Sequence, residues 1–66
     1  MDAKSMGKTI AALRKKQNLT QKELALKLKI SDKAVSKWES GLGFPEITLL
    51  PEISKLFGVS VDYLMT

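Results

Sequence analysis

The chain has 66 residues, of which 44% are hydrophobic and 27% charged, with a net charge of +4 at pH 7. This length predicts one domain, residues 1–66, with a small core, because such a chain buries only about 60% of its unfolded surface. Cysteine and histidine are absent, so we expect no disulfide, no metal, no cofactor and no enzymatic activity. No stretch approaches the roughly 20 apolar residues of a membrane span, and the N-terminal residues lack the apolar core of a signal peptide, so we expect a cytoplasmic protein without a membrane partner.

The charge is unevenly distributed along the chain. Residues 4–37 contain ten Lys or Arg against two acids, a local excess of +8, whereas residues 38–66 carry a net charge of −3. A basic half followed by an acidic half is the polarity expected of a domain that faces a phosphate backbone. Taken singly, six of these lysines are more readily explained by an ordinary solvated helix surface: Lys4, Lys8, Lys15, Lys16, Lys22 and Lys27. Lys33 and Lys37 are set apart because they share one polar helix face.

The first predicted helix covers residues 5–17. Met6, Ile10 and Leu13 recur at helical spacing and form its inward stripe, and Asn18 is the predicted stop.

Two short helices joined by a tight turn are predicted for residues 20–39. The first covers residues 21–28, because Thr20 and Glu23 have the T-x-x-E spacing of a capping box. Its apolar face is formed by Leu24, Ala25 and Leu28. Only two residues remain for the turn.

The next predicted helix covers residues 32–39, and Ser31 is its expected N-cap. Its core face consists of Ala34, Val35 and Trp38, so we expect Trp38 to pack in the core rather than to stack on a base. The opposite face carries short polar and cationic side chains, which are Asp32, Lys33, Ser36, Lys37 and Ser40. Such a face suits a DNA major groove, because lysine donates to guanine, aspartate accepts from cytosine and serine does either. An ordinary surface helix also has a polar face.

A turn and two further helices complete the predicted chain. Residues 40–45 have turn chemistry, and a fourth helix covers residues 48–57. Thr48 is its expected N-cap, with Pro51 still in the first turn, where a missing N–H is tolerated. A fifth short helix covers residues 61–65. The second half of the core is expected from Leu49, Leu50, Ile53, Leu56, Phe57, Val59, Val61 and Leu64.

Ordered motifs extend over nearly the whole chain, from about Lys8 to Leu64. They are Ile10, Leu13 and Arg14, then Leu19-Thr20-Gln21, Glu23-Leu24-Ala25, the run from Val35 to Gly41, Leu49-Leu50, Ile53, and the run from Leu56 to Leu64. This set resembles the phage-repressor/Cro-like family, also called the XRE family. The resemblance implies an all-α, compact five-helix, lambda-repressor-like DNA-binding domain with a helix-turn-helix at about residues 20–39, formed by the second and third helices.

The resemblance further implies a sequence-specific transcriptional regulator that binds double-stranded DNA and reads the major groove with its third helix. The base-reading residues are then Asp32, Lys33, Ser36 and Lys37. The phosphate-binding residues are Thr20, Gln21, Ser31 and Ser40, and Gln21 matches the family's phosphate-contacting glutamine at a helix start. Arg14 and Glu39 match a structural ion pair between the first helix and the end of the third. The family's usual binding to two half-sites implies a weak or DNA-induced homodimer.

The chain departs from the family pattern at two places. Lys29 stands in the turn where the family commonly has glycine in a left-handed conformation, which costs a non-glycine residue about 1 kcal/mol. The best-known phage repressors place glutamine where this chain has Asp32, Lys33 and Lys37. Their operator sequence therefore does not carry over to this chain.

A protein-interaction module of the same fold, such as an antitoxin or a co-regulator, remains the alternative function. RNA binding is disfavoured, because the A-form major groove is too narrow for a helix. Phe44 and Tyr63 lie outside the reading helix and are expected to pack or to face a partner. The sequence is compatible with a whole small regulator or with the N-terminal part of a longer one.

Overall fold

The computed structural model describes residues 2–66, which form helices and turns without a strand. The helical segments are α1 (Ala3–Lys16), α2 (Gln21–Leu28), α3 (Asp32–Glu39), the short 3-10 helix η1 (Ile47–Leu49), α4 (Leu50–Phe57) and α5 (Val61–Met65). The expected all-α class with five α-helices is confirmed within these residues. Met1, which the predicted domain includes, lies outside the described residues. Within residues 2–66, no helix has the length and apolar character needed to cross a membrane.

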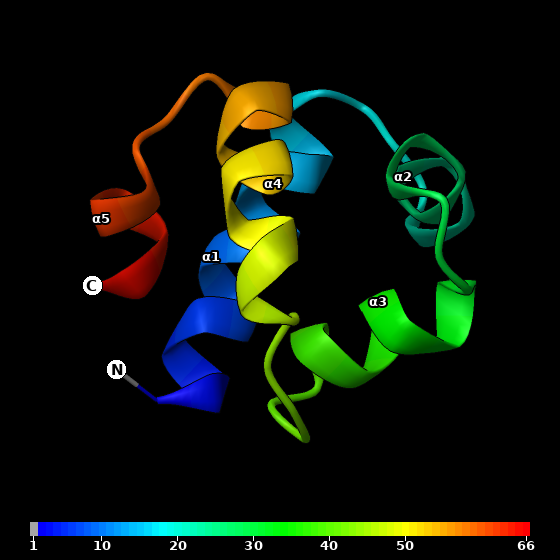
Figure 1. Cartoon of the computed structure of the whole chain (residues 1–66). Helices are drawn as coiled ribbons and strands as arrows, with labels where there is room; N and C mark the ends of the chain where they lie inside the picture. The colour runs from blue at the N-terminus through cyan, green and yellow to red at the C-terminus, as the bar shows by residue number, and fades with distance from the viewer. Residues whose placement is uncertain (1) are drawn as a thin grey trace.

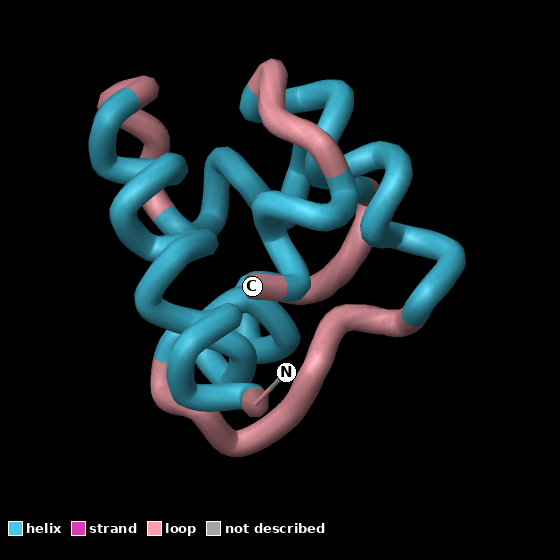
Figure 2. The backbone as a smooth tube through the Cα atoms, turned by 90° about the vertical axis from the view of Figure 1, so that its left-hand side faces the viewer, coloured by secondary structure: helices cyan, strands magenta, loops and turns pink. Residues whose placement is uncertain are grey.

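The helices surround a core to which all five α-helices contribute. Figure 1 shows α2 and α3 on one side and α5 on the other, with α1 and α4 between them. α1 contacts α3 and α5, while α2 contacts α3 and α4 contacts α5. The loop between α3 and α4 runs along the lower edge of the molecule in Figure 2. The buried core residues are Met6, Ile10, Leu24, Ala25, Leu28, Val35, Trp38, Leu50, Ile53, Phe57 and Leu64.

The first helix begins two residues earlier than predicted and ends one residue earlier. The backbone N–H of Ser5 donates to the carboxylate of Asp2 at 2.9 Å, so Asp2 caps the helix start. Sequence reasoning missed this cap because the apolar stripe begins only at Met6. At the other end Asn18, the predicted stop, has a φ of 58°, in the left-handed region, and the helix ends at Lys16 with Gln17 as its C-cap.

The turn between α2 and α3 has the predicted geometry. Lys29 adopts the left-handed conformation, with φ 60° and ψ 43°. Its neighbour Ile30 donates its backbone N–H to the carbonyl of Ala25 at 3.0 Å, which satisfies a carbonyl at the helix end. The observed bounds of α2, α3 and α5 agree with the predicted ones.

The predicted N-cap of the fourth helix is wrong. Thr48 lies inside η1, and α4 begins at Leu50 without a side-chain cap. As an N-cap, the Thr48 hydroxyl would accept the backbone N–H of Leu50 or Pro51. Pro51 has no N–H, and the N–H of Leu50 bonds the carbonyl of Ile47 instead, in the tighter 3-10 geometry.

Helix α1 approaches the end of α3 closely at Gly7. A Cβ atom placed on Gly7 would overlap the carbonyl oxygen of Trp38 and lie 3.2 Å from the Cα atom of Glu39. The first helix therefore crosses the end of α3 with backbone against backbone. This contact fixes the position of the end of α3 relative to α1.

Candidate nucleic-acid interface

The third helix separates a core face from a solvent face. Val35 and Trp38 are buried, with Trp38 only 5% exposed, which confirms its predicted place in the core. All four predicted base-reading residues lie on the exposed face: Asp32, Lys33, Ser36 and Lys37. The aliphatic stem of Lys37 runs beside the α3–α4 loop, since a Cβ placed on Gly43 would lie 3.7 Å from its Cδ and Cε atoms.

The start of α2 carries two of the predicted phosphate ligands. The hydroxyl oxygen of Thr20 accepts the backbone N–H of Glu23 at 3.0 Å, and the Glu23 carboxylate accepts the N–H of Thr20 at 2.8 Å, which completes the predicted capping box. The hydroxyl proton of Thr20 is left for another acceptor. Gln21 is half-buried and donates one amide N–H to Oε1 of Glu39 at 3.0 Å.

The two serines predicted to bind phosphate differ in what they can offer. The hydroxyl oxygen of Ser31 accepts the backbone N–H of Ala34 at 3.2 Å, so it caps α3 as predicted and keeps its proton free to donate. The hydroxyl of Ser40 already donates to the carbonyl of Ser36 at 2.8 Å. A phosphate would receive no side-chain donor from Ser40 unless this hydroxyl rotates away.

Arg14 and Glu39 join α1 to the end of α3. Nε and Nη2 of Arg14 donate to the two carboxylate oxygens of Glu39 at 2.6 and 2.9 Å, a bidentate arrangement. The remaining Nη1 donates to the carbonyl of Leu19 at 2.7 Å. The side chains of Arg14 and Glu39 are only 12% and 9% exposed, so the pair is largely buried rather than an exposed surface salt bridge.

The pKa values of this pair follow from these contacts. Burial raises the pKa of the Glu39 carboxyl, but hydrogen bonds from Arg14 and Gln21 outweigh burial and hold it below its usual value of 4.5. The hydrogen bond to Glu39 raises the pKa of the Arg14 guanidinium, while burial acts in the opposite direction. Both groups therefore stay charged at neutral pH.

Sequence reasoning did not foresee two contacts at this interface. One is the hydrogen bond between Gln21 and Glu39, which lie 18 residues apart in the chain. The other is the backbone crossing at Gly7, although a glycine inside a predicted helix is a signal that helices approach closely. Neither contact follows from residue spacing alone.

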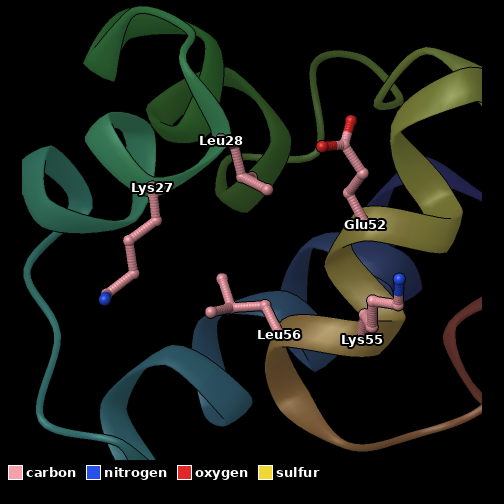
Figure 3. A pocket seen from close by; sticks show the side chains of 5 residues that line it. All are labelled: Lys27, Leu28, Glu52, Lys55 and Leu56. Atoms are coloured by element: carbon pink, nitrogen blue, oxygen red, sulfur yellow. The ribbon is translucent and has the colours of Figure 1, made fainter.

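The surface grooves lie apart from the predicted reading residues. A groove of about 340 Å³ between α2 and α4 is lined by Lys27, Leu28, Glu52, Lys55 and Leu56. Figure 3 shows Leu28 and Leu56 pointing toward each other across it, with the amine of Lys27 turned away. None of the predicted DNA-contacting residues lines this groove. Within residues 2–66, no cluster of three or more His, Cys, Asp or Glu side chains could hold a metal ion.

Comparison with known proteins identifies related sequences. A profile of the helix-turn-helix family matches residues 10–64. The HTH-type transcriptional activator BcrR of Enterococcus faecalis is 50% identical over 54 residues, which cover 82% of this chain and 26% of BcrR. The HTH-type transcriptional regulator ImmR of Bacillus subtilis is 39% identical over 61 residues, covering 92% of this chain and 48% of ImmR. Multiprotein-bridging factor 1 of Candida albicans is 35% identical over 57 residues, covering 86% of this chain and 38% of that protein.

The chain spans between about a quarter and a half of the length of these relatives. Its fold is similar to a crystal structure of the clp gene regulator ClgR from Corynebacterium glutamicum, with a TM-score of 0.84 at 24% sequence identity. That likeness covers 96% of this chain and 67% of the ClgR chain. With the match over residues 10–64, the chain belongs to the helix-turn-helix family, in its phage-repressor/Cro-like (XRE) group.

Proposed function

We propose that the chain is the sequence-specific DNA-binding domain of a transcriptional regulator. In this proposal α3 enters the major groove of double-stranded DNA, and its exposed side chains Asp32, Lys33, Ser36 and Lys37 contact bases. The start of α2, with Thr20 and Gln21, contacts the phosphate backbone together with Ser31 and, after rotation of its hydroxyl, Ser40. No catalytic step belongs to this function.

The observation that carries the proposal is the division of α3 into two faces. Val35 and Trp38 are buried against the rest of the protein, whereas Asp32, Lys33, Ser36 and Lys37 are exposed. Because Ser, Lys and Asp complement the donors and acceptors of base edges, this face is chemically suited to the major groove. The helix also lies in the half of the chain with the +8 charge excess, which suits a phosphate backbone. The two bacterial relatives named above carry names of transcriptional regulators.

Selection from a random DNA pool, followed by affinity measurements on the enriched site, tests the proposal. Lys33→Ala and Lys37→Ala should each weaken binding to that site by about 1–3 kcal/mol and relax base preference. Gln21→Ala should instead weaken binding to all sequences evenly, because phosphate contacts carry little sequence information. Lys55→Ala, which removes the same charge from α4, is the matched control. If both reading-helix variants kept the parent's base preferences, α3 would not be the reader.

Binding should also depend steeply on salt. Each phosphate contacted releases counterions, so the logarithm of affinity should fall by about 0.9 for each phosphate per unit of log salt concentration. A titration with the selected duplex at several salt concentrations measures this slope. A flat response between low and physiological salt would contradict the proposal.

A protein-interaction module is the second candidate, and two observations favour it. One relative is named as a multiprotein-bridging factor. The segment between α3 and α4 also exposes large apolar side chains, with Leu42 73%, Phe44 46% and Ile47 78% exposed. Low salt sensitivity of binding, together with indifference to substitution of Lys33 and Lys37, would support this candidate over DNA binding.

A further inference from the structure

Glu39 connects the two helices of the helix-turn-helix through side chains. It is the last residue of α3, and its Oε1 accepts the amide N–H of Gln21, the first residue of α2, at 3.0 Å. The same oxygen accepts Nη2 of Arg14 at 2.9 Å. The Glu39 carboxylate therefore links the start of α2 to the end of α3.

This contact also fixes the orientation of the Gln21 amide. A carboxylate only accepts hydrogen bonds, so the nitrogen end of the amide must face Glu39. The amide nitrogen has a second N–H, which lies in the same plane and is left for another acceptor. A glutamine without such a partner samples many rotamers and loses that freedom when it binds a ligand.

The charge of Glu39 would by itself disfavour a nearby phosphate. Arg14 compensates it with two hydrogen bonds, so the pair presents no net charge to the solvent. The low exposure of both side chains keeps water from screening this compensation. Glu39 can therefore orient the Gln21 amide without adding a repulsive charge to the DNA-facing surface.

We propose that Glu39 is a positioning residue for DNA binding, which holds the Gln21 amide so that its second N–H is presented to a backbone phosphate. This inference depends on the proposed function, because it assigns Gln21 a phosphate contact. It differs from a purely structural role for the ion pair, because it predicts that Gln21 and Glu39 act on DNA affinity together.

A double-mutant cycle in DNA binding tests the inference. In the parent, Gln21→Met should weaken binding to a fixed duplex about five- to tenfold, since it removes one charge-assisted hydrogen bond. In the Glu39→Met background the same substitution should cost less than about twofold, because methionine offers no oxygen to accept the Gln21 N–H and the amide is no longer held in place. The cycle cancels the one-unit change in net charge that Glu39→Met causes, because both proteins in the second comparison carry it.

The matched control is Lys22→Met, the neighbouring position on α2, which should weaken binding equally in both backgrounds. Equal costs of Gln21→Met in both backgrounds would overturn the inference while leaving DNA binding intact. A parent protein that binds no duplex would overturn the proposed function itself, and the inference with it.

A second measurement, by NMR, avoids any failure of Glu39→Met to fold. In the folded parent, the Gln21 side-chain amide proton that bonds Glu39 should exchange slowly with water before DNA is added, and the Gln21 amide signals should shift when the duplex binds. Rapid exchange of that proton with water in the free protein, or amide signals that do not move on binding, would overturn the inference.

Discussion

Gly7 shows how a single missing side chain decides a helix crossing. Because glycine has no Cβ, the backbone of α1 lies directly against the carbonyl of Trp38. A glycine inside a helix costs about 1 kcal/mol relative to alanine. The crossing offsets this cost by allowing α1 and α3 to pack at short range.

Substitution of Gly7 by alanine should destabilise the fold. We expect a net loss of about 1–3 kcal/mol in the free energy of unfolding, because the new methyl group overlaps backbone atoms that cannot move independently. Denaturant unfolding measures this loss. Lys8→Ala, at the exposed neighbouring position, should change stability by less than about 0.5 kcal/mol. A stabilised Gly7→Ala protein would show that the two helices have room to separate.

Lys29 has a side chain at a position where the backbone favours glycine, because it adopts the left-handed conformation. Lys29→Gly should raise the free energy of unfolding by up to about 1 kcal/mol, because glycine adopts this conformation without strain. The gain is reduced because glycine also gives the unfolded chain more conformational freedom. Lys27→Gly loses the same charge from inside α2 and should lower stability by about 1 kcal/mol. Thermal melting of the two variants gives the comparison. Equal destabilisation by both would mean that Lys29 is unstrained.

At the scale of elements, Arg14 and Glu39 join α1, the turn before α2, and α3. Both side chains are nearly buried, so removing one partner strands the other charge. Arg14→Met and Glu39→Gln should each cost about 3 kcal/mol or more, and the double variant should lose less than the sum. Denaturant unfolding of the three proteins measures the coupling. Single losses below about 0.5 kcal/mol that add in the double variant would show that the pair does not support the fold.

The same pair predicts how stability depends on acid. The pKa of Glu39 is lower in the folded protein than its usual value of 4.5. Its contribution is therefore complete above pH 4.5 and is lost as the pH falls through the lowered folded-state pKa. Glu39→Gln should make the loss of stability below pH 4.5 less steep. Part of that loss should remain in the variant, because the pKa values of Asp2 and Glu23 are also lowered in the folded protein. An unchanged acid profile in the variant would remove Glu39 as a cause.

At the scale of the whole molecule, the open question is how many copies bind one DNA site. A domain this small contacts few base pairs, so high specificity needs two copies on neighbouring half-sites. The exposed large apolar side chains are divided among α2, the segment between α3 and α4, and α5 rather than gathered on one element, whereas a tight interface needs a large buried surface. We therefore predict a protein that is monomeric or weakly dimeric alone and binds the selected duplex as a dimer. Analytical ultracentrifugation measures both states, and one copy on each duplex would contradict the prediction.

The sequence alone determined most of the helix bounds, because the signals for them are local. The capping box at Thr20, the cap at Ser31 and the stop at Asn18 each involve residues within one helical turn, so spacing suffices to find them. The two faces of α3 are likewise set by periodicity. Which exposed residues touch DNA remains a prediction. The predicted N-cap of α4 fails because Pro51 lacks the N–H that Thr48 would accept and the N–H of Leu50 bonds the carbonyl of Ile47 instead.

The tertiary structure decided how these helices meet. The family resemblance pointed to Arg14 and Glu39, but the bidentate geometry, the burial of the pair and its link to Gln21 depend on where α1 crosses α3. That crossing is set by the backbone contact at Gly7, between residues far apart in the chain. Local signals fix which residues share a helix face. Only packing between helices fixes which faces meet, because it depends on the combined shapes of side chains from distant segments.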